Sequence, residues 1–329
     1  MKRGRPGIIV VIVVIVAAIM GAAAAVQQAL TVRDRRRCPP PGLLVNVDGH
    51  QMHLQVRGPD IDGPTVVLDA GIGSFSPNWH WVQVELAPTV KSVAYDRAGL
   101  GWSRPSRRQR DAQTIAMELR DALGEAGIEP PYVVAGHSFG GLPVRAFADL
   151  YPELTAGLVL VDASHPDQWV RWPTPHAAQI LEVSQRIVGW LGWFGLLRVL
   201  NLSRRISAGL PARQAAELRA GAALPGCAAT EAAQIRSWSV SREQLRAAAP
   251  LDDLPLAVLA VSEQPVGGEL LTALQRQLCE LTAHASFETV QGASHESLIS
   301  DREHAHVVAK TILSVVQAAR DRDRAKTIG

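Results

Sequence analysis

A serine between two glycines has the residue types and spacing for nucleophilic chemistry. The run Gly136-His137-Ser138-Phe139-Gly140 follows an apolar stretch, Tyr132–Ala135, and precedes a stretch with helical spacing, Leu142–Leu150. A Gly-x-Ser-x-Gly turn between a strand and a helix is typical of a nucleophile elbow, where the serine adopts a strained backbone conformation. The sequence therefore predicts that Ser138 attacks an electrophilic carbon, as in acyl transfer.

A serine at its ordinary pKa is a poor nucleophile, so it needs a base that a third group orients. His295 lies in the turn Gly292-Ala293-Ser294-His295-Glu296 after an apolar stretch, and we predict it as the base. Asp162 and Glu263 both follow apolar stretches that lie between Ser138 and His295 in the chain. Either carboxylate could fix the tautomer of the histidine. We predict Asp162 as the acid and keep Glu263 as the alternative.

Acyl transfer places negative charge on the former carbonyl oxygen, and preorganised N–H groups stabilise that charge. One donor would be the backbone N–H of Phe139. The second should come from the loop after an early strand. The run Asp69-Ala70-Gly71-Ile72-Gly73 fits, with the N–H of Ile72 as the best candidate. Trp79 follows this loop, and we predict that it lines the substrate pocket, although it could equally be an ordinary core residue.

The elements that must position these residues are short apolar stretches that alternate with stretches of helical spacing. Such a pattern predicts a mostly parallel sheet with helices on both faces, whose functional residues gather at the carboxyl ends of the strands. A first hairpin is expected through the Asp48-Gly49 turn. The expected strands are 43–47, 51–56, 65–69, 91–95, 132–135, 158–161, 254–261 and 287–290, and the expected helices are 114–126, 142–150 and 305–319.

Residues 168–250 interrupt this alternation and look helical throughout, which predicts an inserted cap or lid. Within it, Ile187–Leu197 is apolar almost all round and contains Trp190 and Trp193. The stretch could be a helix buried against the sheet domain, or a lid face that meets acyl chains or a bilayer surface, as interfacial tryptophans do. We predict both tryptophans as substrate-binding residues.

The N-terminal arm predicts a membrane anchor. Ile8–Val26 has no charged residue and is long enough to cross a bilayer as a helix. A cleaved signal peptide, which would leave a secreted protein, is the alternative. Inserted with its N-terminus inside, the anchor would place the body on the outer side. The expected division is 1–32 anchor or signal segment, 33–42 linker, 43–167 and 251–329 core, and 168–250 lid.

Charge and cysteine content argue against a nucleic-acid-binding or metal-binding protein. Residues 1–40 hold seven basic side chains and one acid, so residues 41–329 hold 26 basic and 30 acidic side chains. The basic residues flank an apolar run, so no nucleic-acid-binding surface is predicted. The three cysteines (Cys38, Cys227 and Cys279) lack metal-ligand spacing. We expect no metal and no obligate protein partner.

Three motifs in order resemble the α/β-hydrolase superfamily with an inserted cap, over roughly Leu43 to Ala319. Ala70-Gly71-Ile72-Gly73 resembles its oxyanion motif, and Asp96-Arg97-Ala98-Gly99-Leu100-Gly101-Trp102-Ser103 resembles its Asp-x-x-Gly-x-Gly-x-Ser segment. Gly136–Gly141 resembles its elbow, and His295 its base. The resemblance implies an α/β-hydrolase fold and a Ser-His-acid hydrolase with no metal and no organic cofactor.

The chain departs from the family pattern at two places. Ala70 stands where the family usually has histidine, and the run Val261-Ser262-Glu263-Gln264-Pro265 lacks the expected Gly-Asp-type turn. The second departure leaves the acid open. A serine at the elbow argues against haloalkane dehalogenases and epoxide hydrolases, which use aspartate there. We therefore expect a serine hydrolase that acts on carboxylic esters or lipids. The alternatives are an acyltransferase or thioesterase of the same fold, and a non-catalytic membrane protein that binds a small ligand.

Overall fold

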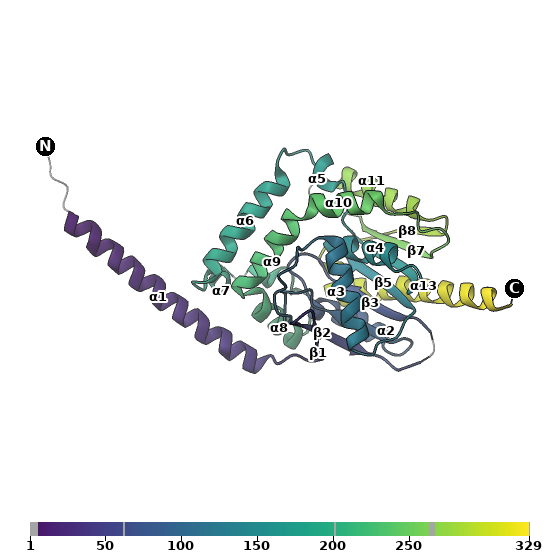
Figure 1. Ribbon diagram of the computed structural model, residues 1–329, viewed down its shortest axis with the longest axis horizontal. Coiled ribbons are helices and arrows are strands. Elements are labelled where there is room, and N and C mark those ends of the chain that lie inside the picture. The colour runs from purple at the N-terminus through teal and green to yellow at the C-terminus, as the bar shows by residue number, and fades with distance from the viewer. Residues whose placement is uncertain (1–5, 62, 201, 263–266, 329) are drawn as a thin grey trace.

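A computed structural model describes residues 6–61, 63–200, 202–262 and 267–328. In this part of the chain, eight strands form one sheet in the order β1-β2-β4-β3-β5-β6-β7-β8 (Figure 1). β1 and β2 pair antiparallel, β2 pairs antiparallel with β4, and every other neighbouring pair is parallel. The strands are β1 (Leu43–Val47), β2 (His50–Arg57), β3 (Thr65–Asp69), β4 (Ser92–Tyr95), β5 (Tyr132–His137), β6 (Thr155–Val161), β7 (Leu256–Val261) and β8 (Ala285–Val290).

The mostly parallel sheet expected from the sequence is confirmed, and its central strands are mainly apolar. β3, β5, β6 and β7 are buried at every residue, as strands covered on both faces must be. β8, at the edge of the sheet, alternates between half-buried and exposed residues up to Val290, which is buried. The β1–β2 hairpin turns at Asp48 and Gly49, which both have positive φ, as a tight two-residue turn requires.

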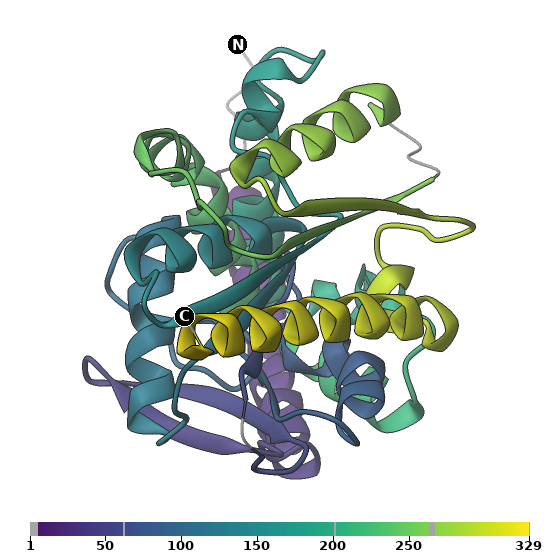
Figure 2. The same cartoon turned by 90° about the vertical axis from the view of Figure 1, so that its right-hand side faces the viewer.

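Helices cover the two faces of the sheet and form a separate core with each. On one face, α2 (His80–Leu86) and α13 (Arg302–Ile328) bury apolar side chains against the strands. On the other, α3 (Ala112–Glu125), α4 (Gly141–Leu150) and α10 (Trp238–Ala247) do the same. Figure 2 shows α13, in yellow, crossing one face of the sheet. The sheet is thus rigidly held, which fixes the loops at the carboxyl ends of its strands.

Residues 168–250 lie between β6 and β7, and no described residue among them belongs to a strand. We call their described residues the helical insertion. Its elements are α5 (Gln168–Arg171), α6 (Ala177–Gly192), α7 (Leu196–Leu200), a 3-10 turn at Leu202–Arg204, α8 (Ala212–Ala222), α9 (Pro225–Arg236) and α10. α6 packs along α9, whereas α10 packs against α3 and α4 of the main body. Shorter helices α11 (Gly268–Gln277) and α12 (Ser297–Ser300) follow β7 and β8.

The N-terminal arm is one continuous helix, α1 (Pro6–Arg37), which projects from the body (Figure 1). Within the described residues, Val10–Arg37 is the one stretch of helix long and apolar enough to span a membrane. The helix continues through residues 33–37, which the sequence had assigned to the linker, and ends just before Pro39–Pro41. Asp34, within this last turn of α1, forms an ion pair with Arg198 of α7.

Candidate active site

Ser138 lies directly after β5, at the start of a 3-10 turn that leads into α4. Its φ of 54° is in the left-handed region, which is unusual for a residue with a side chain and marks a strained elbow. The backbone passes too close to its surroundings for other side chains here. A Cβ on Gly136 would lie 2.4 Å from the carbonyl oxygen of Gly140, and one on Gly140 would lie 2.4 Å from that of Asp69.

The structure brings His295 and Asp162 together. Asp162 follows β6 and is buried, with 2% of its side chain exposed, and its Oδ2 lies 2.5 Å from Nδ1 of His295. Nε2 of Gln275, on α11, donates a hydrogen bond of 2.6 Å to the other carboxylate oxygen. His295 comes from the loop after β8 and keeps 41% of its side chain exposed. The carboxylate therefore accepts a hydrogen bond from Nδ1 and holds the imidazole in one orientation.

These contacts also set the charges of the pair. Burial opposes the charge on both groups, but the hydrogen bond and opposite charge outweigh it. The pKa of Asp162 is lowered, because its bonds to His295 and Gln275 favour the carboxylate over the effect of burial. The pKa of His295 is raised, because Asp162 favours the imidazolium by more than burial disfavours it. Asp162 thus supports a histidine that gains a proton during a reaction.

His137 binds the loop that carries His295, a role that the sequence did not predict. Its Nε2 lies 2.9 Å from the carbonyl oxygen of His295, and the two rings are tilted by 35° with their centroids 4.6 Å apart. Burial, then the charge of His295, lowers the pKa of His137 to about 3, so its ring stays neutral and donates to that carbonyl. Because His137 precedes Ser138 in the chain, this bond ties the elbow to the loop of His295.

The loop after β3 runs beside the elbow. A Cβ on Gly71 would lie 3.1 Å from Cβ and 3.5 Å from Oγ of Ser138. Arg97, which is 2% exposed, donates hydrogen bonds to the carbonyl oxygens of Ala70 and Gly71 and pairs with Asp69. In a trans peptide the C=O and N–H point in opposite directions, so holding the Gly71 oxygen turns the N–H of Ile72 away from the guanidinium.

Arg97 belongs to the motif that the sequence singled out, but its role depends on contacts 26 to 28 residues away. It forms a buried ion pair with Asp69, which also accepts a hydrogen bond of 2.6 Å from the hydroxyl of Tyr95. The neighbouring residue of the motif, Asp96, accepts hydrogen bonds from the backbone N–H groups of Ser76 and Trp102. The motif therefore positions the loops around the elbow.

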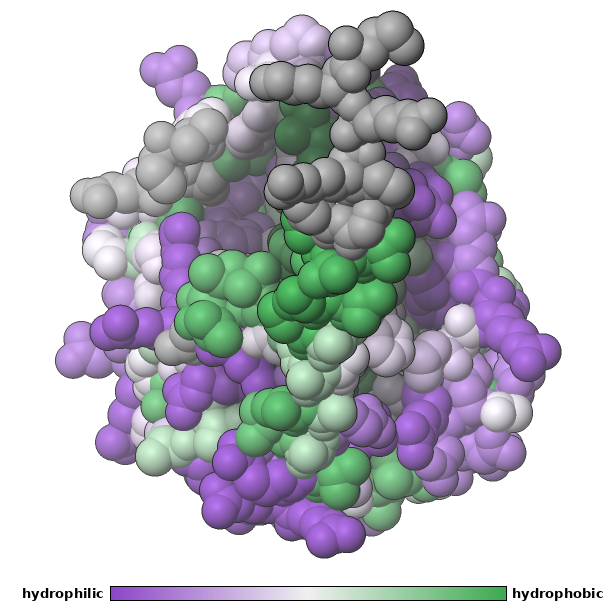
Figure 3. Space-filling model, turned by 90° about the vertical axis from the view of Figure 1, so that its left-hand side faces the viewer, coloured by the Kyte–Doolittle hydropathy of each residue, from purple (hydrophilic) through white to green (hydrophobic). Residues whose placement is uncertain are grey.

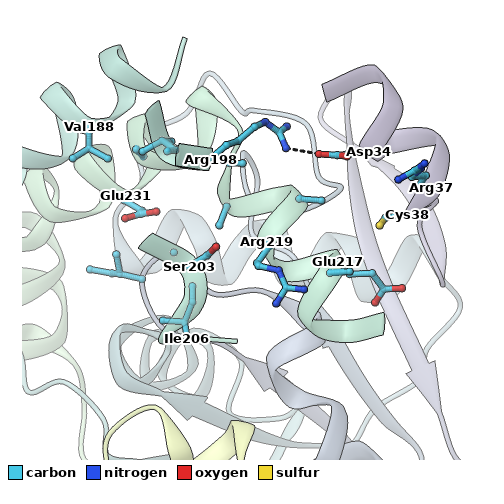
Figure 4. A pocket seen from close by; sticks show the side chains of 18 of the residues that line it. Asp34, Arg37, Cys38, Val188, Arg198, Ser203, Ile206, Glu217, Arg219 and Glu231 are labelled. Carbon is cyan, nitrogen blue, oxygen red and sulfur yellow. Dashed lines mark hydrogen bonds and ion pairs between the residues drawn. The ribbon is translucent and has the colours of Figure 1, made fainter. Parts of the chain in front are cut away.

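A cavity of about 870 Å³ adjoins this loop (Figure 4). Ile72 and Gly73 line it, although Ser138 and His295 do not. The remaining lining comes from the end of α1, including Asp34, and from the helical insertion, including Glu231. Burial raises the pKa of Glu231, whose carboxylate accepts a hydrogen bond from the thiol of Cys227. The cavity thus connects the loop beside Ser138 with α1.

The structure does not gather the tryptophans expected at the substrate pocket. Trp79 is fully buried in the core, with its ring 6.5 Å from that of His137 in an edge-on arrangement. Trp190 and Trp193 lie on the outer surface of the insertion, and neither lines the cavity. The alternative acid, Glu263, lies outside the described residues. Among the residues that are described, no group of His, Cys, Asp or Glu is arranged to hold a metal ion.

Comparison with known proteins places this geometry in context. Residues 66–311 match the model of the alpha/beta hydrolase family. YbdG and YqjL of Bacillus subtilis, both uncharacterized, are 31% identical over 133 residues and 33% identical over 121 residues. These matches cover 40% and 37% of this chain, and 40% and 47% of those proteins. The chain thus spans less than half the length of these curated relatives.

Solved structures share the fold at low identity. The Cif epoxide hydrolase from Acinetobacter nosocomialis superposes with a TM-score of 0.70 at 16% identity, covering 88% of this chain and 96% of that one. A thermophilic esterase from Thermogutta terrifontis superposes with a TM-score of 0.62 at 18% identity, covering 83% of this chain and 98% of that one. At such identities the likeness concerns the fold alone.

Proposed function

Since this chain belongs to the alpha/beta hydrolase family, we propose that it is a serine hydrolase that cleaves carboxylic esters or lipid-like acyl substrates through an acyl-enzyme on Ser138. The observation that carries the proposal is the hydrogen bond between His295 and buried Asp162, next to an elbow whose serine has positive φ. A base held by an acid, close to a serine at a strained elbow, is the arrangement that serine catalysis needs.

In the proposed reaction, Nε2 of His295 takes the proton of the Ser138 hydroxyl as its Oγ attacks the ester carbonyl. Asp162 stabilises the imidazolium that forms. The N–H groups of Ile72 and Phe139 stabilise the oxyanion of the tetrahedral intermediate. His295 then gives the proton to the leaving alcohol, and the acyl group stays on Ser138. Water, activated by the same histidine, attacks the acyl-enzyme, releases the acid and restores the serine.

The side chain at position 138 favours an ester over an epoxide. Some structural neighbours are named epoxide hydrolases, but the resemblance drawn from the sequence assigns those enzymes an aspartate nucleophile at the elbow. This chain has Ser138 there, and serine forms acyl-enzymes. We further propose that α1 anchors the protein in a membrane and that the helical insertion acts as the lid over the site.

The direct test is covalent labelling of the full chain with a fluorophosphonate, which reacts with serines activated by a base. We expect one phosphonyl group per chain, on the peptide that contains Ser138, as measured by mass spectrometry after digestion. Prior denaturation should abolish the label, because activation requires the folded site. A label that maps to another serine, or no label on the folded protein, would contradict the proposal.

We expect Arg97→Lys to lower kcat by about 100-fold with little change in KM, because one oxyanion donor is then no longer held in place. Lysine keeps the positive charge near Asp69 but cannot bind two adjacent carbonyl groups in a fixed geometry. Steady-state kinetics with a soluble ester measures the effect.

The matched control for Arg97 is Arg110→Lys, because Arg110 forms another buried ion pair, with Glu118 on α3. It should lower the thermal stability in a similar way but leave kcat unchanged. An equal fall in kcat for the two variants would show that the loss at Arg97 comes from general destabilisation.

A further inference from the structure

One face of α1 carries polar side chains that bind the helical insertion. Gln27, Thr31 and Asp34 are spaced for a single helical face, and Gln27 and Thr31 are buried. Gln27 donates a hydrogen bond of 3.0 Å to the carbonyl oxygen of Ala223. Arg198 of α7 donates 2.8 Å to the amide oxygen of Gln27 and 3.4 Å to the hydroxyl of Thr31, and forms an ion pair with Asp34 (Figure 4).

These contacts place α7 beside residues 27–34 of α1, and so at a defined distance from the apolar part of that helix. The apolar run Ile8–Val26 ends immediately before Gln27, and the basic residues Arg35, Arg36 and Arg37 end the helix. If the apolar run spans a bilayer, the boundary of the hydrocarbon falls near Gln27. A helix turn rises about 5.4 Å, so Arg198, which binds across two turns from Gln27 to Asp34, lies at this boundary.

The insertion presents an apolar face at the same level. One side of α6 packs on α9, where a Cβ on Gly189 would lie 3.4 Å from that of Ala228. The other side, together with α7, leaves large apolar side chains 49 to 79% exposed, and we call this set the apolar face. Its members are Ile180, Val183, Ile187, Trp190, Trp193, Val199 and Leu200.

The apolar face lies on the side of the body from which α1 projects. Figure 1 shows α6 running crosswise to α1, with α7 beside the helix. Figure 3 looks at this side of the molecule, with α1 pointing toward the viewer, so the hydrophobic atoms at its centre are largely those of α1, and further hydrophobic side chains lie beside them. Exposed apolar patches mark interaction sites, and tryptophan favours the interface between membrane and water. A membrane surface that α1 crosses near Gln27 would therefore contact the apolar face.

The cavity runs from the loop after β3 toward the same membrane surface. Its wall includes Asp34, Arg37 and Cys38 at the end of α1, and Val188 and Leu197 of α6 and α7. At its other end it reaches Ile72 and Gly73, beside Ser138. A substrate dissolved in the bilayer could therefore pass from the membrane along α1 to the loop near Ser138 without crossing bulk water.

We propose that the apolar face rests on the bilayer that α1 enters, and that the cavity between α1 and the insertion takes an ester directly from that bilayer. The substrate class is then a membrane-resident amphiphile with a carboxylic ester, and α1 is a wall of its binding site as well as an anchor. The choice of substrate rests on the proposed function of Ser138, whereas the contact of the face with lipid does not.

The contact is tested with the full chain reconstituted in phosphatidylcholine vesicles, plain or brominated near the head-group end of the acyl chains. Bromine quenches nearby tryptophans. We expect brominated vesicles to quench the wild type more than the double variant Trp190→Phe/Trp193→Phe. Equal quenching of the two proteins would overturn the proposal. A second copy of the chain would then be the occupant if Val183→Glu/Ile187→Glu converts a dimer in detergent into a monomer.

The substrate route is tested with two esters, methylumbelliferyl oleate in the vesicles and methylumbelliferyl acetate in solution. Val183→Glu/Ile187→Glu should lower oleate hydrolysis by about tenfold or more, because charges resist burial in the interface, and leave acetate hydrolysis unchanged. The control is Ile61→Glu, at an exposed apolar residue two positions from Gly63, which lies beside Arg320 of α13. It should change neither rate.

The outcomes separate the two proposals. An equal loss on both esters, or no loss on oleate, would overturn the membrane route. Failure of the wild type to hydrolyse either ester would refute the proposed function, while the quenching measurement would still decide whether the apolar face lies in lipid.

Discussion

Replacing Ser138 by alanine is expected to lower kcat for a carboxylic ester by about 10⁶-fold, with KM nearly unchanged. The substitution removes the oxygen that forms the acyl-enzyme, and the remaining groups do not replace it. Substrate binding should persist, because the cavity is lined by residues other than Ser138. Residual turnover would come from the oxyanion donors and from positioning alone. Steady-state kinetics of the full chain in detergent measures both constants.

Ser164→Ala is the matched control for this prediction. Ser164 lies near the elbow, and its backbone N–H donates a hydrogen bond of 2.9 Å to the carbonyl oxygen of Ser138. Alanine keeps that N–H, so the variant should retain the wild-type kcat. If Ser138→Ala kept more than about a hundredth of the activity, Ser138 would not be the nucleophile, since loss of that group in a serine enzyme costs far more.

The sheet could be predicted because its signals are local. The central strands are short and mainly apolar, and the Asp48-Gly49 turn determines the first hairpin. The extent of α1 could not be predicted in the same way. Prolines at 39–41 show where a helix must end, but the turn before them coincides with the pairing of Asp34 with Arg198, 164 residues away.

The sequence predicted which residues of the candidate site lie at strand ends, but not which of them are in contact. Ser138, Asp162 and His295 each follow a strand, and parallel strands bring their carboxyl ends to one edge. The sequence left Asp162 and Glu263 as alternative acids, because order along the chain does not give the distance to the histidine. The role of Arg97 was missed for a related reason, since its acceptors are backbone carbonyls that no side-chain pattern reveals.

Asp162→Asn is expected to lower kcat/KM for the same ester by about 10⁴-fold. The asparagine fits the space of the carboxylate and can keep its bond to Gln275. It can also donate to Nδ1 of His295, which favours the tautomer that places the proton on Nε2. That nitrogen must be free to take the proton of Ser138, so the variant holds the base in the wrong form. It also leaves the imidazolium without a counter-charge.

The pH profile separates this effect from a structural one. Activity requires neutral His295, and Asp162 raises the pKa of that histidine, so wild-type kcat/KM should fall about tenfold per unit as pH drops below the raised pKa. In Asp162→Asn the charge is gone while burial still disfavours the imidazolium, so the acidic limb should move to lower pH. Glu263→Gln should keep both the rate and the profile. A shift of the limb in Glu263→Gln, with Asp162→Asn unshifted, would reverse the assignment, because the carboxylate bonded to His295 is the group that raises its pKa most.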